Sequence, residues 1–148
     1  MFSIRKKIIV VPCVAVFNRD GKILLLRRGE EKLNKGKWEI PGGGIRFGET
    51  PKQAALRELW EETGFTPKYS DLIPVDSFGI TYKDRVEFII PLYAVRVDGD
   101  PVLSPNEHSD WGWFSLDEVR ELEMKSETMK GTYIMAKSAK EVLEKLGI

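Results

Sequence analysis

The sequence predicts a mixed α/β fold, and three observations lead to this expectation. Two segments rich in β-branched and aliphatic residues, 8–17 and 22–28, are joined by a short turn that ends in Asp20-Gly21. The segment 51–63 carries both the start and the stop signals of a helix. A last segment, 133–146, places apolar residues on one side of a second helix. Strands and helices in this order predict helices packed on a sheet.

The composition predicts one globular domain over residues 1–148. Hydrophobic residues make up 42% and charged residues 31%, as in ordinary globular proteins. Lys plus Arg and Asp plus Glu number 23 each, so no overall charge favours nucleic acid or an anionic membrane. We therefore expect no nucleic acid and no membrane among the partners. A polyanionic ligand must then be held by local groups or by a metal ion.

A cytoplasmic location is expected from two features. Cys13 is the only cysteine, which excludes an internal disulfide and suits a reducing compartment, and its apolar neighbours predict a buried thiol. No apolar run approaches the roughly 20 residues that a membrane-spanning helix needs. The sequence leaves the oligomeric state open, with a homodimer among the alternatives.

The helix at 51–63 has the best-defined boundaries in the chain. Thr50 is a typical N-cap, Pro51 occupies the first helical position, and Gln53 can complete a capping box. Gly64 stands where a glycine usually ends a helix. Glu49, just before the cap, can complement the positive end of the helix dipole.

The remaining elements are predicted from shorter signals. Residues 86–97 are typical of a strand, which Pro91 would interrupt with a bulge or confine to a sheet edge. Residues 110–114 form a short aromatic strand, and Ser115 can cap a helix over 116–122.

Two neighbouring features indicate a functional site. Three consecutive glycines, 42–44, follow Pro41, so backbone rather than side chains can approach another group there. On the following helix, Glu58, Glu61 and Glu62 fall within an arc of about 100°. A solvated surface is the alternative for such a charged face. The adjoining glycines favour a site.

The carboxylate arc predicts a metal-binding helix face. Glutamates this close repel one another, and a divalent cation removes that repulsion. Hard oxygen ligands suit Mg²⁺, with Mn²⁺ as a substitute. Arg57 lies four residues before Glu61 and can pair with it. Residues on the other side of the helix are expected to pack against the sheet. These are Leu56, Leu59, Trp60 and Thr63.

The segment from Gly43 to Phe65 matches the Nudix box, and the chain resembles this family of hydrolases. The motif is Gly, five residues, Glu, seven residues, then Arg-Glu-apolar-any-Glu-Glu-any-Gly-apolar, and every specified position is filled. A chance match is on the order of 10⁻⁷. The longer stretch 18–65 resembles the MutT branch. The resemblance implies the Nudix α/β/α sandwich with a central mixed β-sheet.

The resemblance also implies roles for residues. The metal ligands would be Glu58, Glu61, Glu62 and a carbonyl at Gly42 or Gly43. Two residues are alternatives for the general base: Glu58, or the loop residue Glu107. By its spacing, Arg57 would hold the Glu61 carboxylate in place, with an ordinary surface ion pair as the alternative. Substrate contacts are expected from Arg28, Gly43 and Tyr82, the first through a guanidinium suited to phosphate.

The implied activity is pyrophosphohydrolysis of a nucleoside diphosphate linked to a further group. The MutT-like stretch favours a nucleoside triphosphate, an oxidised one included, cleaved to a nucleoside monophosphate and pyrophosphate. Dinucleoside polyphosphates, ADP-ribose and nucleotide sugars are the alternative substrates. A nucleotide-sensing module without catalysis is the alternative of another class, because a fold alone does not fix function.

Overall fold

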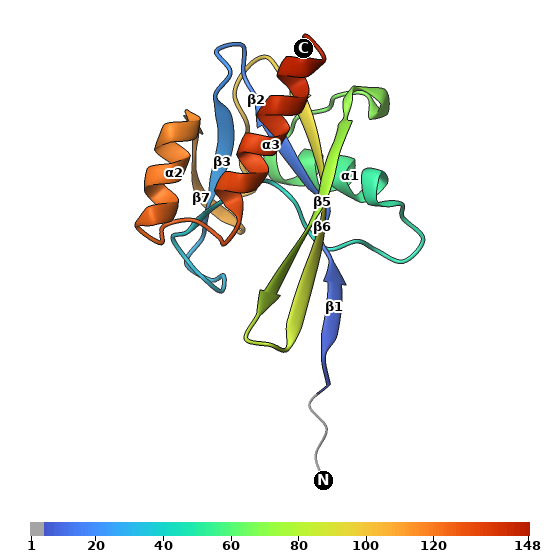
Figure 1. The fold of residues 1–148 in the computed structure, drawn as a ribbon, viewed down its shortest axis with the longest axis vertical. Coiled ribbons are helices and arrows are strands. Elements are labelled where there is room, and N and C mark those ends of the chain that lie inside the picture. The colour runs from blue at the N-terminus through green and yellow to red at the C-terminus, as the bar shows by residue number, and fades with distance from the viewer. Residues whose placement is uncertain (1–4) are drawn as a thin grey trace.

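The protein is a sandwich with one mixed sheet between helices (Figure 1). A computed structural model describes residues 5–148. Helix α1 packs on one face of the sheet, and helices α2 and α3 cover the other. The elements in chain order are β1 Lys7–Val10, β2 Cys13–Phe17, β3 Ile23–Arg28, β4 Trp38–Glu39, α1 Pro51–Thr63, the 3₁₀ turn η1 Tyr69–Asp71, β5 Ile73–Tyr82, β6 Val86–Arg96, β7 His108–Phe114, α2 Leu116–Met124 and α3 Thr132–Lys145.

The sheet is split on one side, and the glycine segment enters the split. β1 and β2 pair in parallel with β6, whereas β5 pairs with β6 in antiparallel. β3 pairs in antiparallel with β4 and β7 but meets β2 only at Phe17 and Ile23. Beyond that point the chain following β4 occupies the gap, where Gly42 pairs with Cys13. The topology thereby brings glycine backbone to the middle of the sheet.

Alternation along β2 separates two hydrophobic cores. Val14 and Val16 pack with Leu59 of α1, while Ala15 and Phe17 face α2 and α3. All of these residues are almost completely buried. Both faces of the sheet are therefore covered, as the sequence of strands and helices predicts.

The predicted strand at 8–17 is wrong in one respect, because it is two strands. The ladder breaks at Val11 and Pro12, since proline has no backbone N–H to donate. The prediction for Pro91 is also wrong: β6 runs through it without a bulge. Pro91 lies opposite the break between β1 and β2, where no N–H is required. The bulge lies instead in β5, between Pro74 and Asp76, on a strand that the sequence did not reveal.

The helices follow their local signals closely. α1 has the predicted bounds, with the Thr50–Gln53 capping box and Gly64 in the left-handed conformation. α2 starts at its Ser115 cap but extends two residues beyond the prediction, to Met124. α3 begins at Thr132 rather than Tyr133. Within residues 5–148 no helix has the length and apolar character to cross a membrane.

Candidate active site

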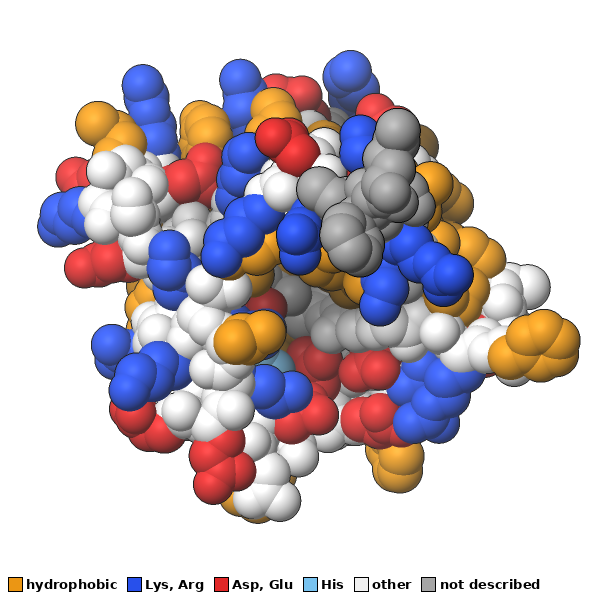
Figure 2. Space-filling model, turned by 90° about the horizontal axis from the view of Figure 1, so that it is seen from below, with side chains coloured by type: hydrophobic (Ala, Val, Ile, Leu, Met, Phe, Trp, Pro, Cys, Tyr) orange, Lys and Arg blue, Asp and Glu red, His pale blue; other side chains and the backbone are white. Residues whose placement is uncertain are grey.

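The three glutamates of α1 lie together but differ in exposure. Glu62 is buried, with 3% of its surface exposed, whereas the side chains of Glu58 and Glu61 are 14% and 37% exposed. Seen from below the orientation of Figure 1, acidic side chains gather in a depression with Lys and Arg side chains around it (Figure 2). The exposed fractions show that this helix face is largely covered rather than open surface.

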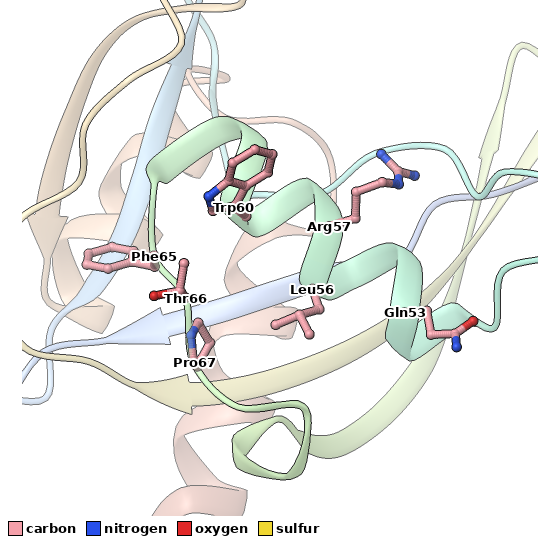
Figure 3. A pocket seen from close by; sticks show the side chains of 7 residues that line it. All are labelled: Gln53, Leu56, Arg57, Trp60, Phe65, Thr66 and Pro67. Carbon is pink, nitrogen blue, oxygen red and sulfur yellow. The ribbon is translucent and has the colours of Figure 1, made fainter.

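Trp60 does not pack against the sheet as expected, whereas Glu62, on another side of α1, is buried. Trp60 was expected to pack against the sheet, but 59% of its surface is exposed. Leu59 and Ala55 fill the inner face of α1, and Trp60 follows about 100° further round the helix. It lines a shallow, mainly apolar cavity on the outer side of α1 (Figure 3). That cavity holds no carboxylate, so it is not the site of the acidic cluster.

Burial and neighbouring charges raise the pKa of Glu62 well above its usual range. Desolvation is the main cause, followed by the negative charges of Glu39, Glu58 and Glu107. No Lys, Arg or His of residues 5–148 forms an ion pair with Glu62. An ionised Glu62 therefore needs a positive charge that the described side chains do not supply.

Arg57 holds the other carboxylates in place. Its guanidinium donates to Glu49 at 2.6 and 2.9 Å, to Glu58 at 2.8 Å and to Glu61 at 3.3 Å. It also reaches the Gly44 carbonyl at 3.2 Å. These hydrogen bonds raise the pKa of Arg57 and lower the pKa of Glu49 to about 2. The predicted Arg57–Glu61 pair is confirmed, and Glu49 acts on Arg57 rather than only on the helix dipole.

Glycine backbone packs directly against Glu58. A Cβ atom on Gly43 would overlap the Glu58 carboxyl group, and one on Gly42 would overlap the Cys13 sulfur. The Gly43 N–H donates to Pro12 O at 3.3 Å, which fixes the loop at the split in the sheet. The backbone of Gly43 is therefore next to the acidic cluster.

Replacing Gly43 by alanine should lower kcat by about 100-fold, because the new methyl group must displace the Glu58 carboxylate by about 1 Å or more. Gly44→Ala is the matched control, since a Cβ there meets no atom within 4 Å. Steady-state kinetics of both variants measure the effect. Equal activity in the two variants would show that the position of Glu58 does not matter.

The other predicted residues are only partly brought to the cluster. Glu107 is close enough for its charge to raise the pKa of Glu62, and it forms a 3.8 Å ion pair with Lys32. Tyr82 lies at the end of β5, 48% exposed beside Lys83, and none of its described contacts involves the glutamates of α1. Arg28 is near the cluster, but its guanidinium is bound to Glu39.

Two residues of the site were missed in the sequence. Glu39 and His108 lie side by side, with His108 Nε2 2.9 Å from Glu39 Oε2. The sequence assigned no role to the histidine and did not single out the glutamate. The only signal in the sequence was that Glu39 directly precedes the Ile40-Pro41-glycine segment. Cys13 is buried as predicted, and burial together with the nearby glutamates raises its pKa.

The chemistry of these donors fits a divalent cation. Within residues 5–148 no three carboxylate, imidazole or thiol groups are arranged as a ligand set, and Arg57 donates hydrogen bonds to both Glu58 and Glu61. The fit rests on the buried Glu62 carboxyl group, which lacks a cationic partner among several acids, and on hard oxygen atoms that line one hollow.

Fold and site together define a class of protein: an α/β sandwich with clustered carboxylates beside a glycine loop. Comparison with known proteins agrees with this class. The family model of the NUDIX domain matches residues 6–134, and the chain belongs to this family of hydrolases. The fold is therefore the Nudix fold, and the protein is a Nudix hydrolase family enzyme. Such enzymes are typically dependent on divalent metal ions.

Three similar proteins illustrate the relationship. A MutT-like protein of Streptomyces ambofaciens is 33% identical over 107 residues, covering 72% of this chain and 63% of that protein. An RNA pyrophosphohydrolase of Roseobacter denitrificans is 30% identical over 129 residues, covering 74% and 79%. The crystal structure of a MutT protein from Methanosarcina mazei Go1 superposes with a TM-score of 0.72 at 28% identity, covering 98% of this chain and 99% of that one.

Proposed function

We propose that this enzyme is a Mg²⁺-dependent pyrophosphohydrolase that cleaves a nucleoside triphosphate, an oxidised one included, to a nucleoside monophosphate and pyrophosphate. The observation that carries the proposal is the buried Glu62, placed among the acids Glu39, Glu58 and Glu107 without a cationic partner. The choice of a triphosphate rests on the resemblance to the MutT branch, and a MutT-like relative and a MutT structure are among the similar proteins.

The proposed metal ligands are Glu58, Glu61, Glu62 and the carbonyl of Gly42 or Gly43, with Mn²⁺ able to replace Mg²⁺. A bound divalent ion supplies charge neutralisation on the phosphates and lowers the pKa of a water molecule. Arg57 aligns Glu58 and Glu61, so that the cluster is ordered before the substrate arrives.

Glu107 is the better candidate for the general base. Glu58 already accepts a hydrogen bond from Arg57 and is confined by the backbone of Gly43. Glu107 is 43% exposed in its side chain and is restrained only by the long ion pair to Lys32. It can therefore approach a water molecule at the cluster, whereas Glu58 is placed to act as a ligand.

The 5′-triphosphate end of RNA is a second candidate substrate. Several relatives, at 30–33% identity, are named RNA pyrophosphohydrolases. Basic residues also adjoin the acidic cluster, because Lys32 contacts Glu107 and Arg46 lies 3.6 Å from Glu61. Such side chains can contact the phosphates of a longer strand even though the chain has no net charge.

A substrate panel in Mg²⁺ tests the proposal. It contains canonical and oxidised nucleoside triphosphates, 5′-triphosphorylated RNA, ADP-ribose, diadenosine polyphosphates and a nucleotide sugar, with monophosphate, pyrophosphate and phosphate measured for each. We expect triphosphates to release pyrophosphate. Glu61→Gln should lose most turnover but remain folded, because Glu61 is partly exposed. Wild-type activity in this variant would contradict the metal assignment, and tight binding without turnover of any compound would indicate a sensor.

A further inference from the structure

Arg28, Glu39 and His108 form a hydrogen-bonded group at the edge of the acidic cluster. They come from three neighbouring strands, β3, β4 and β7, where Arg28 is opposite His108 and Glu39 is opposite Leu26. Leu26 packs on the face of the sheet that α1 covers, so Arg28, two residues later, and Glu39, opposite Leu26, are on that face too. His108 is on the same face, opposite Arg28, because β7 is irregular between His108 and Asp110. Their side chains are 20%, 20% and 4% exposed, so the group is largely shielded from water.

The hydrogen bonds of Arg28 leave little of its guanidinium for a ligand. NH1 donates to both carboxylate oxygens of Glu39, at 2.9 and 3.0 Å, and Nε donates to the Leu33 carbonyl at 2.7 Å. A bidentate contact with phosphate needs two adjacent nitrogens of the guanidinium. NH2 could form such a contact only together with NH1 or with Nε, and both of these nitrogens already donate hydrogen bonds within the protein. Arg28 is therefore built into the protein rather than open to a phosphate group.

Glu39 connects this group to the parts of the site. Its carboxylate accepts two bonds from Arg28 and lies within hydrogen-bonding distance of His108 Nε2. In the chain, Glu39 directly precedes Ile40 and the Pro41-glycine loop, and His108 directly follows Glu107. Glu39 also lies close enough to Glu62 for its charge to act on that carboxyl group. One carboxylate thus joins the glycine loop, the Glu107 loop and the end of β3.

We propose that Arg28, Glu39 and His108 act as a positioning clamp, which sets the glycine loop and Glu107 relative to the carboxylates of α1. Arg28 is then a positioning residue and not a substrate ligand. Its loss should lower kcat by about 10–100-fold, the usual effect of removing a group that orients a site residue. The affinity for substrate should not change. The proposal rests on the hydrolase activity of the family and on no particular substrate.

The test compares Arg28→Met, Glu39→Gln and the double variant with wild type. We expect each single variant to lose kcat with KM unchanged, and the double variant to be no worse than the more damaged single one, because both remove the same clamp. Arg27→Met is the matched control. Arg27 is on the same strand but on the opposite face, over the ring of Trp38, and its loss should leave kcat unchanged.

Two further measurements do not depend on turnover. The dissociation constant of an α,β-methylene nucleoside triphosphate, measured in EDTA, should be the same for Arg28→Met and wild type. Loss of a phosphate contact would instead raise the dissociation constant by about 10–100-fold. His108 is the only histidine, so its ring resonances are assigned without ambiguity in an NMR spectrum. They should shift in Arg28→Met and Glu39→Gln but not in Arg27→Met.

The outcomes separate the alternatives. Raised KM and analogue dissociation constant in Arg28→Met, with effects that add in the double variant, would make Arg28 a phosphate ligand and overturn the clamp. Unchanged kinetics and unmoved His108 resonances would overturn it as well. If Arg28→Met does not fold, Arg28→Lys replaces it, because lysine keeps the positive charge but not the planar guanidinium group. The same loss of kcat at constant KM is expected for this variant. If wild type hydrolyses nothing, the proposed function fails, while the resonance and affinity measurements still judge the clamp.

Discussion

Replacing Glu62 by glutamine is expected to abolish turnover and to stabilise the metal-free protein. A metal ion at the site would lower the activation barrier by several kcal/mol. Loss of about 4 kcal/mol of this stabilisation corresponds to a decrease of about 10³-fold in kcat. The gain in stability has a separate cause. Glu62 is buried beside other acids, and burial raises its pKa well above the usual range. An ionised Glu62 therefore destabilises the fold at neutral pH, whereas glutamine carries no charge.

The sign of the pH dependence follows from this shift. The folded protein holds a proton on Glu62 more tightly than the unfolded chain, whose glutamate titrates at the ordinary value of 4.5. Stability from this group is fully present below that value and is lost as the pH rises through the folded pKa. The thermal midpoint of Glu62→Gln should therefore exceed that of wild type near pH 8 and approach it near pH 4.5. Each kcal/mol corresponds to about 2–4 °C for a chain of this size.

Differential scanning calorimetry in EDTA, with Glu141→Gln as the control, measures this effect. Glu141 is an exposed glutamate of α3, so its neutralisation should leave the midpoint unchanged at every pH. A Glu62→Gln protein that is less stable than wild type at pH 8 would show that Glu62 is not an uncompensated buried charge. Retained turnover in the same variant would remove Glu62 from the site.

The sequence predicted those features that depend on neighbouring residues. Helix α1 has the predicted bounds because its cap, its proline and its terminal glycine act within a few residues of one another. The contact of Arg57 with Glu61 could be predicted for the same reason, since both are on one helix. The acidic arc was visible as a pattern, but the burial of Glu62 within it was not.

What could not be predicted depends on the register of distant strands. Arg28, Glu39 and His108 meet because β3 is paired with β4 on one side and with β7 on the other, across as many as 80 positions of the chain. No local pattern encodes that pairing. The exposure of Trp60 could not be predicted either. Hydrophobicity alone places tryptophan inside, but Leu59 and Ala55 fill the inner face of α1, and Trp60 is left exposed.

Removal of divalent metal is expected to abolish activity completely and to lower the stability of wild type. The described side chains offer no cation to Glu62, so an added ion is needed to hold an ionised carboxylate among Glu39, Glu58 and Glu107. Exhaustive chelation should therefore stop hydrolysis, and Mg²⁺ or Mn²⁺ should restore it. Binding to the folded state alone also stabilises it, by about 2.7 kcal/mol when the free ion is at 100 times its dissociation constant.

The two effects of the metal can be tied to one residue. At pH 8, titration of Mg²⁺ should raise the thermal midpoint of wild type, while Glu62→Gln should respond much less, because its buried amide does not need a counter-charge. At pH 5 the wild-type response should also shrink, since a proton then competes with the ion for Glu62. Full activity after chelation would contradict the whole mechanism. Lost activity with an equal Mg²⁺ response in both proteins would keep the metal requirement but move the ion away from Glu62, toward Glu58 and Glu61.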